Sequence, residues 1–170
     1  MVNHIAALLI QYKAIETGEF TLASGAKSTY YIDVKTAVTH PDLLSAIAQV
    51  VAQSQEFDVV AGVAVGGVPL AVATALVAKK PYAIIRAGEK SHGKKDVIIG
   101  EVRDKNVLLV EDVTTSGGSA LYGIEVLRAA GAHASRVVTV VDREQGAEAM
   151  LRRQGIDFLP LVRLSEILKE

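Results

Sequence analysis

The sequence predicts an α/β fold with a doubly wound parallel sheet, because continuous apolar runs alternate with helix-like segments along most of the chain. Strands that are apolar on both faces occur in parallel sheets covered by helices on each side. The runs are 59–64, 83–85, 107–110 and 137–141. The segments between and after these runs carry the helical patterns, at Val68–Ala78, Ser119–Ala130 and Ala147–Gln154. Each crossover between parallel strands should be right-handed.

A small addition precedes this alternating part. Val2–Ile15 has the apolar spacing of an amphipathic helix, and extended segments are expected around Phe20–Leu22 and Tyr30–Val34. Pro41, at a favoured first helical position, opens the next predicted helix. Residues 97–101 come just before the run at 107–110, so we predict a hairpin or flap there. We expect one domain over residues 1–170.

Composition excludes several classes of function. The 170 residues carry a net charge of −1, which leaves no overall basic field for nucleic acid or anionic lipid. The chain has no cysteine, so disulfides and Cys-ligated zinc are excluded, and its four histidines lack metal-ligand spacing. No apolar run is long enough to cross a membrane, and no basic region precedes the first apolar stretch. We expect a cytoplasmic protein without membrane or nucleic-acid partners.

The segment after the run at 107–110 carries the strongest chemical signal. Glu111 and Asp112 come where that strand is expected to end, and the residues from Thr114 to Ser119 are all hydroxyl residues or glycine. A helix follows at once, so backbone N–H groups, hydroxyls and the positive end of the helix dipole can hold a phosphate. The acidic pair would then accept hydrogen bonds from vicinal hydroxyls. These residues together predict a site for a ribose 5-phosphate.

Three other interpretations of glycine- and hydroxyl-rich segments fit this sequence less well. A helix-capping loop has similar composition, but one capping residue would suffice for it. A Walker A loop is excluded here because no Gly-Lys precedes a Ser or Thr, and Gly88–Lys94 matches only its first part. The dinucleotide fingerprint fails because Gly62, Gly66 and Gly67 have the wrong spacing.

Residues 107–120 resemble the phosphoribosyl pyrophosphate (PRPP) signature of the type I phosphoribosyltransferases. Further motifs are similar to the orotate phosphoribosyltransferase family in its short, archaeal-like form, and the resemblance covers about residues 15–165. These motifs are Gly18–Leu22 with Ser24-Gly25, Tyr30–Asp33, the set Arg86, Lys90, His92 and Gly93, and the pair Asp142-Arg143.

The resemblance implies transfer of the phosphoribosyl group from PRPP to orotate, releasing pyrophosphate. It implies a catalytic role for Lys90, Asp112 and His92, and orotate contacts from Thr115 and Arg143. The residues it implies for PRPP binding are Arg86, Lys90, His92, Glu111, Asp112, Val113, Thr114, Thr115, Ser116, Gly117, Gly118 and Ser119. Mg²⁺ is the implied cofactor, held mainly by the diphosphate and the ribose hydroxyls, and no metal-ligating residue is assigned.

The resemblance also implies a homodimer with active sites shared across the interface. Residues 87–96 would form a mobile lid over the partner's site, and residues 1–40 a hood over the substrate. By composition alone, residues 87–96 read as a solvated surface loop. Many bacterial members have lysine where this chain has Ala23 and Ala87, which bears on affinity and rate.

Several single residues keep two interpretations. Arg86 fits either a diphosphate ligand or a surface ion pair, and Val63–Pro69 fits both a tight turn and a diphosphate loop. Asp142 could orient Arg143, whose planar guanidinium suits a carboxylate. Tyr30 and Tyr31 fit either core packing or contact with a pyrimidine. Transfer to another nucleobase and a non-catalytic, PRPP-binding regulator remain alternative functions.

Overall fold

Two sheets organise the chain in the computed structural model, which describes residues 4–21, 25, 27–54, 56–87 and 97–168. The main sheet has six strands in the order β5-β4-β3-β6-β7-β8. All neighbouring pairs in it are parallel except β4 with β5. Its strands are β3 (Val59–Val63), β4 (Tyr82–Ile85), β5 (Ile98–Ile99), β6 (Asn106–Thr114), β7 (His133–Asp142) and β8 (Asp157–Arg163).

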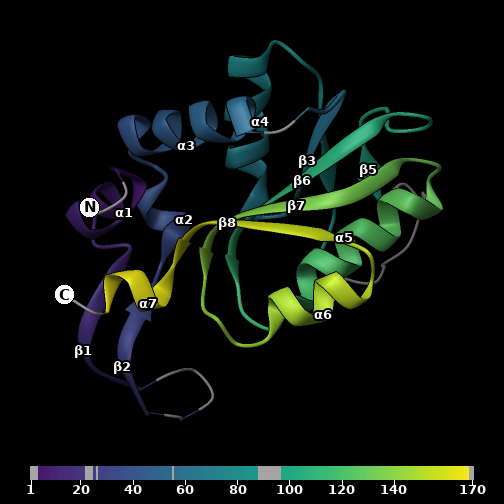
Figure 1. Cartoon of the computed structure of the whole chain (residues 1–170). Coiled ribbons are helices and arrows are strands. Elements are labelled where there is room, and N and C mark those ends of the chain that lie inside the picture. Colours follow the sequence, from purple (N-terminus) through teal and green to yellow (C-terminus); the bar gives the residue numbers. More distant parts are fainter. Residues whose placement is uncertain (1–3, 22–24, 26, 55, 88–96, 169–170) are drawn as a thin grey trace.

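Helices cover both faces of this sheet, which confirms the predicted fold class. One core packs α1 (His4–Gln11), α3 (Pro41–Ser54) and α4 (Gly67–Ala78) against one face. The other packs α5 (Gly118–Ala129) and α6 (Ala147–Arg153) against the opposite face. Figure 1 shows these two groups of helices on opposite sides of the strands.

The N-terminal addition forms a separate antiparallel pair, β1 (Ile15–Thr21) and β2 (Lys27–Ile32). It lies on the side of the molecule where β8 ends and the short helix α7 (Leu164–Ile167) begins (Figure 1). The expected extended segment at Tyr30–Val34 is wrong at its end, because α2 (Val34–Ala37) begins there. Asp33 caps this helix, since its side chain accepts a hydrogen bond from the Thr36 N–H at 3.0 Å.

Two further differences from the expected elements matter for the site. β8 was not predicted; it is an edge strand with charged ends and a proline at Pro160, so it lacks a continuous apolar run. β6 continues four residues beyond the expected end at Val110. Residues 97–101 do contain the expected hairpin strand, and β5 pairs with β4 rather than with β6.

The extension of β6 creates a step at the carboxyl edge of the sheet. On one side β6 pairs with β3 only as far as Gly62 with Val110. On the other side it stays paired with β7 as far as Thr114 with Asp142. Residues 111–114 of β6 therefore project past the end of β3, into the region where parallel α/β sheets bind ligands.

Candidate active site

The projecting part of β6 presents two carboxylates on opposite faces of the sheet. Glu111 and Asp112 are 4% and 7% exposed. Neighbouring strand residues alternate in direction, and Glu111 accepts a hydrogen bond from Ser119 Oγ at the start of α5, at 3.1 Å. Asp112 points the other way, where its Oδ2 lies 3.5 Å from Lys35 Nζ of α2. The acidic pair is thus held by two elements far apart in sequence.

Burial gives Glu111 an unusual proton affinity. Loss of solvent raises the pKa of Glu111 from its ordinary value of 4.5 to about 7, and the charge of Asp112 adds to the rise. The Ser119 hydrogen bond and the Lys35 charge act in the opposite direction. Hydroxyl groups that donate hydrogen bonds to this carboxylate would stabilise its charged form.

A small hollow of about 100 Å³ lies next to Glu111. It is lined by Glu111 and by the run from Val113 to Ala120. The first turn of α5 opens onto it, so unpaired backbone N–H groups and the positive end of the helix dipole face this space. Its size, position and donors suit a phosphate group.

Glycine is required at the mouth of the hollow. Gly117 has φ +88°, and a Cβ there would lie 2.7 Å from Met150 Cε. Thr114 contributes differently from its neighbours, because its hydroxyl is buried and donates to Thr139 Oγ1 at 2.9 Å. The side-chain oxygens left to face a ligand are those of Thr115, Ser116 and Ser119.

The turn after β3 fits closely against Asp112. A Cβ on Gly66 would lie 2.3 Å from Asp112 Oδ2, and one on Gly67 would lie 2.8 Å from the Val110 carbonyl oxygen. Both glycines are therefore needed for packing against β6. This agrees with the tight-turn interpretation of Val63–Pro69, and the turn also borders the Asp112 carboxylate.

Arg143 follows β7 and lies beside the hollow. Its backbone N–H donates to the Thr114 carbonyl oxygen at 2.9 Å, and its Nη2 donates to Tyr30 Oη at 3.4 Å. The guanidinium carbon sits 5.3 Å from the centre of the Tyr30 ring. Arg143 Nε is buried and, among the described residues, finds no hydrogen-bond acceptor. A bound carboxylate would supply one.

The expectation that Asp142 orients Arg143 is wrong. Asp142 instead pairs with Arg163 at the end of β8, with Nη1 and Oδ2 3.3 Å apart. The same Arg163 nitrogen reaches Glu148 of α6 at 2.9 Å. The Asp142 carboxylate is thus paired with Arg163 of the unpredicted strand β8. The side chain that contacts Arg143 is Tyr30, where Asp142 was expected.

Arg86 stands at the carboxyl end of β4, as expected, and is exposed. Its N–H donates to the Val97 carbonyl oxygen at 2.9 Å, and its carbonyl accepts from Tyr122 Oη at 3.1 Å. These contacts close the base of the connection between β4 and β5. Lys90 and His92, with the rest of the expected lid from Gly88 to Asp96, lie outside the described residues.

Lys35 is the site residue that the sequence did not reveal. A signal was present, since Asp33 directly before the apolar residue Val34 is typical of a helix start. That pattern locates α2 but does not say which strand the helix faces. The contact with Asp112 depends on the tertiary packing of α2 against β6.

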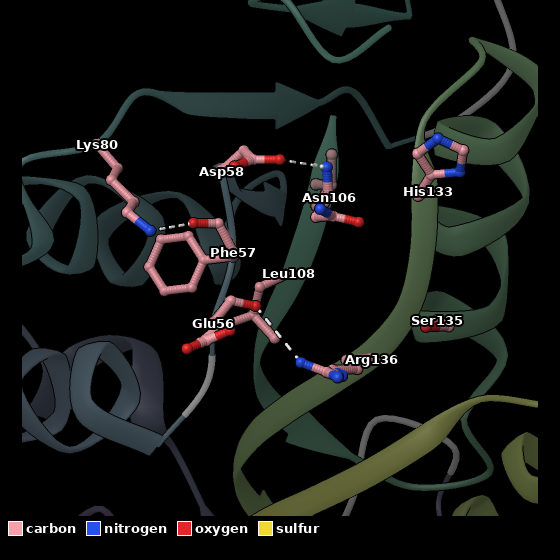
Figure 2. Close-up of a pocket in the computed structure, with 10 residues that line it drawn as sticks. Glu56, Phe57, Asp58, Lys80, Asn106, Leu108, His133, Ser135 and Arg136 are labelled. Carbon is pink, nitrogen blue, oxygen red and sulfur yellow. Dashed lines mark hydrogen bonds between the residues drawn. The ribbon is translucent and has the colours of Figure 1, made fainter. Parts of the chain in front are cut away.

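A second cavity, of about 410 Å³, lies at the opposite edge of the sheet, where β3, β6 and β7 begin (Figure 2). Several of its polar groups bond to one another: Lys80 Nζ donates to the Phe57 carbonyl, and Asp58 Oδ2 accepts from the Asn106 N–H at 2.9 Å. It lacks the carboxyl-edge position of the predicted site. We do not assign it to the substrate.

No group of three or more His, Cys, Asp or Glu side chains in the described part of the chain could hold a metal ion. In the same part of the chain, every helix is too short or too polar to cross a lipid bilayer.

The site has the features of a class of protein, the α/β proteins that bind a phosphorylated sugar at the carboxyl edge of the sheet. Comparison with known proteins agrees. Residues 38–153 match the family described as the phosphoribosyl transferase domain. A protein of Methanocorpusculum labreanum named orotate phosphoribosyltransferase is 64% identical, with 99% of each chain covered. One of the same name from Methanoculleus marisnigri is 61% identical, with the same coverage.

Solved structures give the same result. The orotate phosphoribosyltransferase of Aeropyrum pernix is 31% identical, with a TM-score of 0.81 over 97% of this chain and 96% of that one. The Mycobacterium tuberculosis enzyme in complex with PRPP is 25% identical, with a TM-score of 0.81 over 98% and 99% of the two chains. The chain belongs to the orotate phosphoribosyltransferase family.

The raised pKa of Glu111 makes a prediction about stability. The folded protein binds this proton more tightly than the unfolded chain, so stability falls as the pH rises from about 4.5 through about 7. Glu111→Gln removes the cost of burying the charge. We expect the variant to match wild type near pH 4.5 and to exceed it by about 3 kcal/mol at pH 8 in urea unfolding.

The control is Glu125→Gln on the exposed face of α5, for which the difference from wild type should stay small at both pH values. An equal gain for Glu111→Gln at pH 4.5 and pH 8 would contradict the raised pKa.

Proposed function

We propose that this protein transfers the 5-phosphoribosyl group of PRPP to orotate, giving orotidine 5′-monophosphate and pyrophosphate. The buried carboxylate pair beside the phosphate-sized hollow carries the proposal. A ribose 5-phosphate has a phosphate at one end and vicinal hydroxyls a few ångströms away. The hollow could hold the phosphate, and the adjacent acids of β6 could hold the hydroxyls. The names of the relatives, up to 64% identical, support orotate as the acceptor.

Ribose and its phosphate are held by complementary groups in this proposal. The 5′-phosphate lies in the hollow, where it accepts hydrogen bonds from the first turn of α5 and from Thr115, Ser116 and Ser119. The ribose hydroxyls donate to Glu111 and Asp112. The transition state has oxocarbenium character, so the protein acts by fixing the sugar and by surrounding it with fixed negative charge.

Orotate lies between Tyr30 and the end of β7. The guanidinium group of Arg143, whose Nε lacks an acceptor, binds the carboxylate of orotate. Because a buried N–H without an acceptor is costly, a carboxylate ligand that accepts from Nε gains both charge attraction and a hydrogen bond. Thr115, adjacent in the loop, contacts the ring. This assignment also explains why Tyr30 of β2 contacts Arg143, which directly follows β7.

The diphosphate of PRPP leaves toward the end of β4. Arg86 contacts it there, and Lys90 and His92 act on it from the connection between β4 and β5, in a homodimer whose lids reach the partner's site. Mg²⁺ bound to the diphosphate offsets its negative charge when present.

The direct test follows orotate absorbance in the presence of PRPP and Mg²⁺. We expect orotate to be consumed and orotidine 5′-monophosphate to form, with no turnover of uracil, adenine or hypoxanthine. Turnover of another base, with orotate not consumed, would show that orotate is not the acceptor. Binding of PRPP without turnover of any base would indicate a non-catalytic regulator instead of an enzyme.

Arg143→Gln should weaken the binding of orotate without weakening the binding of PRPP. Loss of a charge-assisted hydrogen bond corresponds to a factor of about 10 to 100, so KM for orotate should rise by about that factor while KM for PRPP changes little. Arg153→Gln, on the exposed part of α6, is the control and should behave as wild type. An unchanged KM for orotate in Arg143→Gln would remove Arg143 from the orotate site.

Shared active sites predict that two inactive variants rescue each other. Lys90→Ala lacks the lid cation and Asp112→Asn lacks a ribose ligand, so each alone should be nearly inactive. A mixed dimer places both defects in one site and leaves the other site intact. Mixing equal amounts should restore about a quarter of wild-type turnover, because half of randomly assembled dimers are mixed. No recovery, with subunit exchange verified, would place each lid over its own subunit's site.

A further inference from the structure

We infer that Lys35 is a positioning residue for the ribose site: by pairing with Asp112, it holds that carboxylate in place for the sugar hydroxyls. The inference rests on the proposed function and adds a residue to it. Its basis is the 3.5 Å contact between Lys35 Nζ and Asp112 Oδ2, which joins the N-terminal addition to β6.

The helix that carries Lys35 is fixed on both sides. Its flanking residues Val34 and Ala37 are each 1% exposed, within the core that also packs α1 and α3. The Asp33 carboxylate caps the helix through the Thr36 N–H and the Thr36 hydroxyl, at 3.0 and 2.7 Å. A single anchored turn therefore directs the Lys35 side chain toward the carboxyl edge of β6.

Asp112 is confined by the same arrangement. Its side chain is 10% exposed, against 64% for Lys35. One side of the carboxylate lies against Gly66, where even a Cβ would come within 2.3 Å of Oδ2. Lys35 Nζ forms its ion pair with the same oxygen, at 3.5 Å. The two contacts limit rotation of the carboxylate, which leaves it oriented before ligand arrives.

Charge gives the pair a second role. Glu111 and Asp112 are adjacent and buried, and the ligand brings a phosphate to the hollow beside them. In the described part of the chain, Lys35 is the one cation that forms an ion pair with either carboxylate. It also opposes the rise in the pKa of Glu111. Loss of Lys35 should thus weaken every ligand that contains the ribose 5-phosphate unit.

The test measures the dissociation constants of PRPP and of orotidine 5′-monophosphate by calorimetry. Because Lys35 is largely solvated, we expect Lys35→Ala to raise both constants by about three- to fivefold, and by the same factor. Lys35→Arg should restore most of the affinity. Lys105→Ala, an exposed lysine away from the site, is the matched control and should bind both ligands as wild type does.

A double-mutant cycle tests whether Lys35 acts through Asp112. In an Asp112→Asn background, Lys35→Ala should have little further effect. Full additivity of the two changes would overturn the inference, as would a loss confined to PRPP, which would indicate direct contact with the diphosphate. Unchanged affinity of Lys35→Ala would overturn it too. In each of these cases wild-type turnover of orotate would leave the proposed function standing.

Discussion

Burial of two adjacent carboxylates on one strand is the constraint around which the site is arranged. Removing charge from water is costly unless the charge is paired or hydrogen-bonded. Glu111 and Asp112 are buried because they lie on the part of β6 that extends past the end of β3 and remains paired with β7. The strand ladder fixes the backbone, so the two side chains must point to opposite faces. Each then needs its own partner, Ser119 on one face and Lys35 on the other.

These partners bring distant parts of the chain together. α5 supplies Ser119 and, in the same turn, the backbone donors of the phosphate-sized hollow. The N-terminal addition supplies Lys35 to the acidic pair and Tyr30 to Arg143. The family match begins at residue 38, after both of these residues. The addition therefore contributes to the site through side chains that lie outside the matched region.

Much of this could be predicted from the sequence. The apolar runs and the acid-hydroxyl-glycine segment have strong local patterns, so the sheet, the helices on both faces and the short connection from β6 to α5 were predictable. β8 was not, because an edge strand with Pro160 and alternating burial lacks such a pattern. Lys35, the Arg163 partner of Asp142 and the buried Thr114 hydroxyl depend on contacts between remote segments. No local pattern encodes these contacts.

The central claim is that the hollow and the carboxylate pair bind one ribose 5-phosphate unit together. A crystal structure with orotidine 5′-monophosphate tests this most directly. The account predicts the phosphate within hydrogen-bond distance of the backbone N–H groups at Ser116–Ser119, and the ribose hydroxyls on Glu111 and Asp112. A phosphate bound elsewhere, with the hollow closed or the acids turned away from the sugar, would contradict it.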